Sequence, residues 1–141
     1  MKRFVLDCSV AMSWCFEDEG DSYSTDILTA LATSEAVVPC IWPLEVGNVL
    51  LVAERRNRLK PADSSRFLGL LCALPIGVEA GVTAEVLDKI VSLGRQQDLS
   101  SYDAAYLELA MREGLPIATV DDRLRRAAEA LGVAIAGLPE S

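Results

Sequence analysis

The chain has 141 residues, of which 51% are hydrophobic and 24% charged, a balance typical of a folded globular protein. Its net charge of −8 argues against nucleic-acid binding over the whole surface, because phosphate binding requires clustered Lys and Arg side chains. The sequence contains no His, which excludes Ser-His-Asp and Cys-His catalysis, zinc sites of the Cys₂His₂ kind and His as a general base.

Short apolar segments bounded by polar residues predict five strands. They cover residues 3–7, 36–39, 76–80, 116–120 and 133–137. Helical patterns fill the gaps, at residues 9–16, 22–34, 41–57, 62–73, 83–97, 101–113 and 122–131. Strands that alternate with helices form parallel sheets through βαβ crossovers. We therefore expect one α/β domain over residues 1–141, with a central parallel sheet of four or five strands and helices on both faces.

The first predicted strand, in "RFVLDCSV", ends in a carboxylate at Asp7. A continuous apolar run such as Phe4-Val5-Leu6 is typical of a strand that is buried on both faces. Open α/β sheets build their sites at the carboxyl ends of such strands, so Asp7 is a candidate site residue. The alternative is that Asp7 only caps the helix that follows.

A second acid, Glu45, lies near the apolar face of the helix predicted over residues 41–57. Trp42, Val46 and Val49 share that face at about 100° per residue, and Glu45 lies roughly 70° from its centre. A buried ionised Glu is costly without a partner. The alternative is an edge residue whose carboxylate reaches water.

A third acid, Asp103, lies on the apolar side of the helix predicted over residues 101–113. The apolar arc of this helix contains Tyr102, Tyr106, Leu109 and Ala110. Glu108 and Arg112 are expected to pair at i,i+4 away from that arc. The alternative for Asp103 is a capping box with Ser100, since the sequence "SSYD" fits the S-x-x-[DE] pattern.

The fourth acid, Asp121, ends the strand predicted over residues 116–120, and Asp122 follows it directly. Either could be the N-cap of the next helix, where the helix dipole favours a negative charge. If the first and fourth strands are neighbours, the four acids gather in one cleft. Arg123, the nearest basic residue, lies two positions past Asp121, a spacing at which helical side chains do not face each other.

Unpaired carboxylates in one cleft repel each other and raise one another's pKa. A hard divalent cation such as Mg²⁺ or Mn²⁺ relieves this repulsion, because these ions prefer oxygen ligands. Acidic sites that hold such ions activate water and stabilise in-line displacement at phosphorus. The set therefore favours a metal-dependent phosphoryl-transfer site, with Asp7 as a ligand rather than a cap.

Basic residues are concentrated in two runs, 54–60 and 121–129, which hold seven of the thirteen Lys and Arg residues. These runs are candidates for phosphate contacts, with a solvated face as the alternative. The candidate residues are Arg55, Arg56, Arg58, Arg123, Arg125 and Arg126. The acidic run over residues 17–26 favours a solvated face.

Cys8, Cys15, Cys40 and Cys72 show no C-x-x-C spacing, which indicates buried free thiols in a reducing compartment and predicts a cytoplasmic location. No apolar run reaches the roughly 18 residues that would span a bilayer. The N-terminus leads into the first strand without a signal-peptide pattern. We therefore expect no membrane partner.

Four segments, in this order, resemble the PIN-domain nucleases, especially the toxin subunits of VapBC-type toxin–antitoxin pairs. They are "VLDCSVAMSWCFEDE", "VPCIWPLEVGNVLLVAERRNRL", "LSSYDAAYLELA" and "IATVDDRLRRAAEALGV". The resemblance implies a PIN-like three-layer sandwich and Mg²⁺- or Mn²⁺-dependent hydrolysis of RNA. It also implies that the catalytic and metal-binding acids are Asp7, Glu45, Asp103 and Asp121.

The resemblance further implies supporting roles for Ser9, Asn48 and Thr119. Ser9, in the D-x-S pattern, would position water at the metal, and its alternative is the N-cap of the first helix. Asn48, in E-x-x-N, would orient a ligand, and its alternative is a buried amide bonded to backbone. Thr119 precedes Asp121 in T-x-D. Asp122 departs from the basic residue that is often expected there, which leaves open whether Asp121 alone or both acids face the metal.

As partners, the resemblance implies an RNA substrate, a cognate antitoxin and a second copy of the chain in a homodimer. The alternative function is a catalytically silent PIN domain that acts as an RNA- or protein-binding module. The presence of all four acids argues against that alternative, because a silent copy has no reason to keep carboxylates that repel each other.

Overall fold

The computed structural model describes residues 2–16, 18 and 20–137. Its elements are β1 (Lys2–Leu6), α1 (Cys8–Cys15), α2 (Ser22–Ala30), β2 (Ser34–Val38), α3 (Trp42–Arg55), α4 (Pro61–Cys72), β3 (Ile76–Val78), α5 (Ala84–Gln97), α6 (Ser101–Glu113), β4 (Ile117–Ala118) and α7 (Asp122–Ala130). The four strands form one sheet in the order β3-β2-β1-β4. Every strand pair is parallel.

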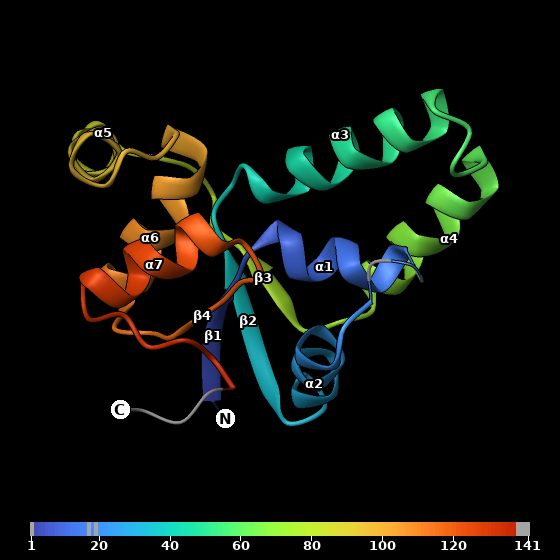
Figure 1. Ribbon diagram of the computed structural model, residues 1–141, viewed down its shortest axis with the longest axis horizontal. Helices are drawn as coiled ribbons and strands as arrows, with labels where there is room; N and C mark the ends of the chain where they lie inside the picture. Colours follow the sequence, from blue (N-terminus) through green and yellow to red (C-terminus); the bar gives the residue numbers. More distant parts are fainter. Residues whose placement is uncertain (1, 17, 19, 138–141) are drawn as a thin grey trace.

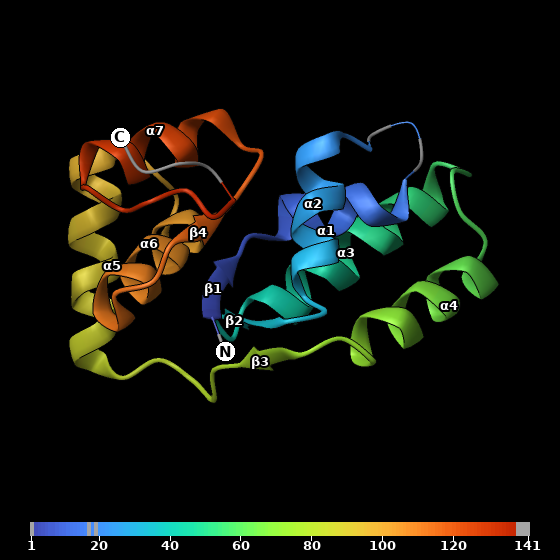
Figure 2. The same cartoon turned by 90° about the horizontal axis from the view of Figure 1, so that it is seen from below.

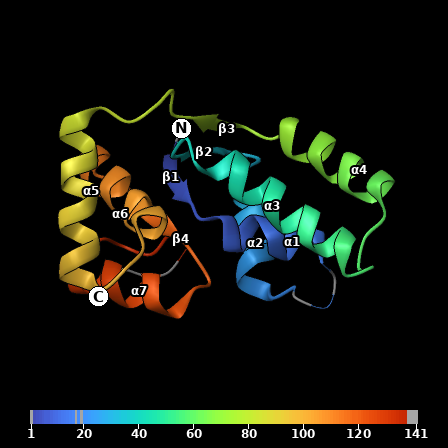
Figure 3. The same cartoon turned by 90° about the horizontal axis from the view of Figure 1, so that it is seen from above.

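Helices cover both faces of this sheet, so the predicted three-layer α/β fold is confirmed. α1 to α4 lie on one side of the strands and α5 to α7 on the other (Figure 1, Figure 2). Figure 3 shows α3 and α4 reaching away from the sheet on the side opposite α5. Within the described residues, no helix is long and apolar enough to cross a membrane.

β1 lies at the centre of the core because its apolar residues are covered on both faces. Phe4, Val5 and Leu6 are all buried, as the continuous apolar run predicts. β1 is the neighbour of β4, with Leu6 in register with Ala118. The carboxyl ends of these two strands therefore meet at one edge of the sheet, just before Asp7.

The boundary between α2 and β2 differs from the prediction. The helix predicted over residues 22–34 ends at Ala30, and the strand begins at Ser34 rather than at residue 36. Ser34 and Glu35 are polar, so an apolar-run criterion passes over them although the backbone of both residues pairs with β1.

The fifth predicted strand, over residues 133–137, is reduced to one parallel bridge between Ile135 and Ile117. Gly132 and Gly137 have φ values of +74° and +80°, which only Gly adopts readily. The chain therefore turns on both sides of Ile135, and too few residues remain extended to form a ladder.

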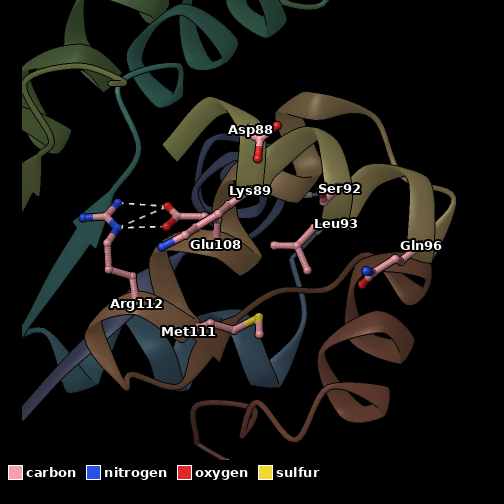
Figure 4. Close-up of a pocket in the computed structure, with 8 residues that line it drawn as sticks. All are labelled: Asp88, Lys89, Ser92, Leu93, Gln96, Glu108, Met111 and Arg112. Carbon is pink, nitrogen blue, oxygen red and sulfur yellow. Dashed lines mark hydrogen bonds and ion pairs between the residues drawn. The ribbon is translucent and has the colours of Figure 1, made fainter. Parts of the chain in front are cut away.

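Two assignments on α6 were wrong. Tyr102, expected in the apolar arc, is 58% exposed, and Glu108, expected away from it, is 4% exposed. Glu108 is buried because Arg112 donates to it at 2.9 Å and also binds Glu79 at 2.9 Å. Figure 4 shows Glu108 and Arg112 on the wall of a pocket between α5 and α6 that has a volume of about 550 Å³.

Replacement of Arg112 by Ala should destabilise the fold, because Glu108 would remain buried without a cation. We expect a loss of roughly 1–3 kcal/mol in the free energy of unfolding, measured by urea denaturation. Arg66→Ala is the matched control, since Arg66 pairs with Asp63 at the surface. A surface pair contributes about 0–1 kcal/mol. Equal losses in both variants would show that the Glu108 pair adds nothing beyond a surface ion pair.

Candidate active site

The four acids that the sequence singles out line one pocket beside the carboxyl ends of β1 and β4. Its volume is about 510 Å³. Asp7 follows β1, and Asp121 lies between β4 and α7. Glu45 and Asp103 each lie in the first turn of a helix, α3 and α6 respectively. Four different elements thus bring their carboxylates to one place.

Nine other residues line the same pocket. They are Cys8, Ser9, Met12, Ser13, Phe16, Asp21, Val49, Arg58 and Val120. Asp21 was not predicted here, because it lies in an acidic run, residues 17–26, that favours a solvated face. Asp21 is the N-cap of α2, where its Oδ1 accepts a hydrogen bond from the Ser24 backbone N–H at 2.6 Å. Cys8 was expected only as a buried thiol, and burial raises its pKa to about 12.

Asp7 does not cap α1. It occupies the N-cap position, but its side chain makes no capping hydrogen bond. Its Oδ2 instead accepts hydrogen bonds from the Ser9 hydroxyl at 2.6 Å and from the Thr119 hydroxyl at 2.8 Å. Asp7 is 5% exposed. Burial raises its pKa, the two hydroxyl donors lower it, and the charges of Asp103 and Asp121 raise it further.

Ser9 and Thr119 connect α1 to the segment that follows β4. The Val120 N–H donates to the Ser9 hydroxyl at 3.2 Å, and the Asp121 N–H donates to the Thr119 hydroxyl at 3.0 Å. Ser9 lies inside α1, so the alternative that it is the N-cap of this helix is wrong. The two hydroxyls therefore fix the position of the Asp7 carboxylate relative to the backbone of Asp121.

Glu45 is held inside the pocket by a tyrosine. The Tyr106 hydroxyl donates to Glu45 Oε1 at 2.6 Å. Burial raises the pKa of Glu45, the Tyr106 bond lowers it, and the charges of Asp7 and Asp103 raise it. The alternative of an edge residue whose carboxylate reaches water does not fit this bond.

Asn48 does not lie with the other predicted residues. Its side chain is exposed, and it is absent from the pocket lining. The alternative of a buried amide is therefore wrong, and its supporting role stays a prediction.

Of the two hydrogen bonds that define a capping box, Asp103 takes part in only one, through its backbone N–H. The Ser100 hydroxyl caps α6 by accepting a hydrogen bond from the Asp103 backbone N–H at 3.1 Å. On α4 the other half of the motif occurs, where Asp63 Oδ2 accepts from the backbone N–H of the N-cap residue Lys60 at 2.9 Å. The Asp103 carboxylate faces the pocket instead. Burial raises its pKa, as does the charge of Asp121, while Ser100 and then Arg123 lower it.

Asp121 is both a pocket residue and a helix cap. Its Oδ1 accepts from the Leu124 backbone N–H at 2.9 Å. Asp122 is exposed and does not line the pocket. Of the two adjacent acids, Asp121 lines the pocket together with Asp7, Glu45 and Asp103, and Asp122 does not.

The basic residues differ in how close they lie to the acids. Arg58 lines the pocket, where its guanidinium lies 4.3 Å from the centre of the Phe16 ring and 3.3 Å from Asp18. Arg123 is near enough to lower the pKa of Asp103, which the sequence spacing did not predict. Arg55, Arg56, Arg123 and Arg126 are exposed. Among the described residues, no Lys or Arg forms an ion pair with any of the four acids.

Arg125 points into the protein rather than toward solvent. Its Nη2 donates to the Thr119 backbone carbonyl at 2.8 Å, and its guanidinium lies 5.2 Å from the centre of the Tyr23 ring. It therefore supports the segment that carries Thr119. A basic run on an amphipathic helix does not reveal this, because a long Arg side chain at the edge of the apolar face can turn inward.

The donor set of the pocket fits a hard divalent cation. It offers carboxylate and hydroxyl oxygens, which Mg²⁺ and Mn²⁺ prefer. Asp7 is buried and forms no ion pair with a Lys or Arg of the described residues. Within the residues that the structure describes, no three His, Cys, Asp or Glu side chains already form a tight coordination group. An open arrangement is compatible with Mg²⁺, which keeps several waters and takes one or two carboxylates.

The fold agrees with comparisons to known proteins. A solved structure of PAE2754 from Pyrobaculum aerophilum has a TM-score of 0.70 at 20% identity, over 89% of this chain and 84% of that one. VapC20 from Mycobacterium tuberculosis, described as a toxin that cleaves the sarcin–ricin loop, has a TM-score of 0.62 at 15% identity, over 88% and 94%. VapBC2 from Rickettsia felis, bound to a DNA fragment from its promoter, has a TM-score of 0.66 at 12% identity, over 94% and 96%.

No curated protein matches the sequence significantly. At these identities, the likeness to the solved structures shows a shared fold. The family model of the PIN domain matches residues 4–130, which contain all four acids of the pocket. The chain therefore belongs to the PIN-domain family.

Proposed function

We propose that the chain is a Mg²⁺- or Mn²⁺-dependent endoribonuclease and the toxic component of a toxin–antitoxin pair. The observation that carries this proposal is the pocket in which Asp7, Glu45, Asp103 and Asp121 meet without an ion-paired Lys or Arg among the described residues. The pKa of Asp7, Glu45 and Asp103 is raised in each case, with burial as the largest cause. Carboxylates that share a cleft and have pKa values raised by burial are candidates for a catalytic site.

In this mechanism the four acids bind the cation directly or through water. Once bound, a divalent cation neutralises phosphate charge and lowers the pKa of a water molecule. Ser9 and Thr119 hold Asp7 Oδ2, which fixes the orientation of the carboxylate. Since the chain has no His, the proton acceptor is one of the carboxylates.

Cleavage assays with defined RNAs test this function. We expect purified protein to cut RNA in Mg²⁺ or Mn²⁺, to lose this activity in EDTA and to regain it when the metal is restored. Asp7→Asn protein, purified in parallel, controls for a contaminating nuclease. The metal requirement would be contradicted if the wild type cleaved RNA undiminished in EDTA while the Asp7→Asn protein did not cleave it.

The proposed partners are an RNA substrate, a protein antitoxin and a second copy of the chain in a homodimer, and we propose that the protein acts in the cytoplasm. The support for the antitoxin is that a structural neighbour from Klebsiella pneumoniae is described as a toxin–antitoxin complex. Co-expression with the neighbouring gene product, followed by size-exclusion chromatography, tests the antitoxin and the homodimer together.

Phosphate contacts are proposed for the exposed arginines around the pocket, and Arg58 and Arg123 are the best placed. Arg58→Ala and Arg123→Ala should each weaken RNA binding uniformly across sequences. Each should also reduce the slope of log K against log salt by about 0.7 for single-stranded RNA. Arg66→Ala on α4, whose guanidinium is exposed, serves as the control. Unchanged affinities and slopes in both pocket variants would assign these arginines to the solvated surface.

A further inference from the structure

Tyr106 is a core residue, as the sequence predicts, and it lies behind the lining of the acidic pocket, where it contacts Glu45. It is on α6, one turn after Asp103, and its side chain is 0% exposed. Its hydroxyl donates to Glu45 Oε1 at 2.6 Å. Among the described residues, this is the one hydrogen bond that joins α3 to α6. It therefore connects the two helices that carry Glu45 and Asp103.

Glu45 needs a restraint to remain in the pocket. Its side chain is long and flexible, and it is only partly buried. The neighbouring charges of Asp7 and Asp103 repel its carboxylate. A rotation toward water would relieve both the repulsion and the cost of burial. The short bond from Tyr106 opposes that rotation.

Tyr106 depends equally on Glu45. A buried hydroxyl without an acceptor destabilises the fold, so the Tyr106 hydroxyl requires the Glu45 carboxylate as its acceptor. The bond uses Oε1, while Oε2 accepts no hydrogen bond from the described residues. One oxygen of Glu45 is thus anchored and the other is left for a ligand.

We propose that Tyr106 is a positioning residue of the metal site, whose hydroxyl anchors Glu45 so that its second oxygen faces the cation. This inference rests on the proposed metal-dependent function. Hydrogen-bond partners behind a metal ligand commonly contribute 10- to 100-fold to metal affinity. Tyr106 itself touches neither cation nor RNA in this proposal.

Manganese binding to the Tyr106→Phe variant tests the proposal without any cleavage assay. The variant keeps the aromatic ring and removes only the hydroxyl. We expect its Kd for Mn²⁺, measured by electron paramagnetic resonance of free Mn²⁺, to rise about 10- to 100-fold. Tyr23→Phe is the matched control, because it deletes a hydroxyl that donates to the Ala136 carbonyl at 2.7 Å, outside the pocket. Its Kd should match the wild type.

A double-mutant cycle shows whether Tyr106 acts through Glu45. In a Glu45→Gln background, Tyr106→Phe should change the Kd for Mn²⁺ no further. A wild type that binds no Mn²⁺ would overturn the proposed function and this inference together. A wild type that binds Mn²⁺ while Tyr106→Phe binds it equally well would overturn only the inference, as would an undiminished effect of Tyr106→Phe in the Glu45→Gln background.

A second measurement needs no substitution at Tyr106 and covers the case in which Tyr106→Phe fails to fold. The chain has three tyrosines, Tyr23, Tyr102 and Tyr106. In protein labelled with 3-fluorotyrosine, Tyr23→Phe and Tyr102→Phe assign the first two ¹⁹F signals, and Tyr106 follows by exclusion. Titration with Mg²⁺ should shift the Tyr106 signal and leave the Tyr23 signal in place. A Tyr106 signal that does not move while Mg²⁺ binds would overturn the inference.

Discussion

Asp7→Asn should abolish RNA cleavage and leave the metal-free protein at least as stable as the wild type. A bound cation supplies several kcal/mol of transition-state stabilisation, and each 1.4 kcal/mol corresponds to about a tenfold change in rate. We therefore expect the rate to fall at least about 100-fold. The fold should survive because Asn offers an oxygen that can still accept from Ser9 and Thr119, the partners of Oδ2.

The stability of the same variant should depend on pH in a defined direction. An Asp side chain titrates near 3.8 in an unfolded chain, and burial raises the pKa of Asp7 in the fold. The folded state therefore binds this proton more tightly than the unfolded state. The resulting stabilisation is complete below pH ~4 and is lost as the pH rises through the folded-state pKa. Asp7→Asn lacks this titration.

In EDTA, Asp7→Asn should therefore be no more stable than the wild type near pH 3. Its excess stability should grow as the pH rises, until Asp7 of the wild type is fully ionised. Thermal melts across this range measure it. Asp88→Asn is the control, because Asp88 is exposed on α5, outside the acidic pocket. An Asp7→Asn protein that is less stable than the wild type at neutral pH in EDTA would mean that the charge of Asp7 stabilises the fold.

The positions of the acids could be predicted because each lies at a place that the local pattern defines. Asp7 and Asp121 follow apolar strands, and neighbouring parallel strands bring their carboxyl ends together. Glu45 and Asp103 lie on or near the apolar sides of α3 and α6, the sides that a helix buries against the rest of the protein. The helical period leaves a second interpretation open for each of these two acids, and the set of four acids, rather than either helix alone, predicted a common site.

The partners of these acids were harder to predict, because their residue types have other ordinary uses. Tyr106 is apolar enough to belong to the core, and only the folded chain brings its hydroxyl to Glu45, 61 positions away. Arg125 belongs to a basic run, yet it binds the Thr119 carbonyl. Long-range pairings of this kind leave no local pattern, so a single sequence does not reveal them.

Asp103→Asn separates a metal ligand from a helix cap, and the two interpretations predict opposite signs. If Asp103 acts only through the dipole of α6, the loss of its charge should cost about 0.3–1 kcal/mol and leave cleavage unchanged. The pocket geometry favours the other outcome. Burial and the charge of Asp121 raise the pKa of Asp103, so its ionised form is disfavoured in the metal-free fold at neutral pH.

Asp103→Asn should therefore be as stable as the wild type, or more stable, at pH 7 in EDTA. It should also gain less stability from added Mg²⁺, because a ligand stabilises by RT ln(1 + [L]/Kd) and the variant would have a larger Kd. Its cleavage rate should fall at least about 100-fold, for the same reason as that of Asp7→Asn.

Asp63→Asn provides the matched comparison, since Asp63 occupies the same helical position on α4 and its carboxylate does accept from the N-cap backbone N–H. We expect this variant to lose stability, to keep the full stabilisation by Mg²⁺ and to cleave RNA at the wild-type rate. Melting curves of the three proteins with and without Mg²⁺, alongside RNA cleavage, complete the test. If Asp103→Asn behaves like Asp63→Asn, then Asp103 only stabilises the N-terminus of its helix. The metal site would then be built from Asp7, Glu45 and Asp121.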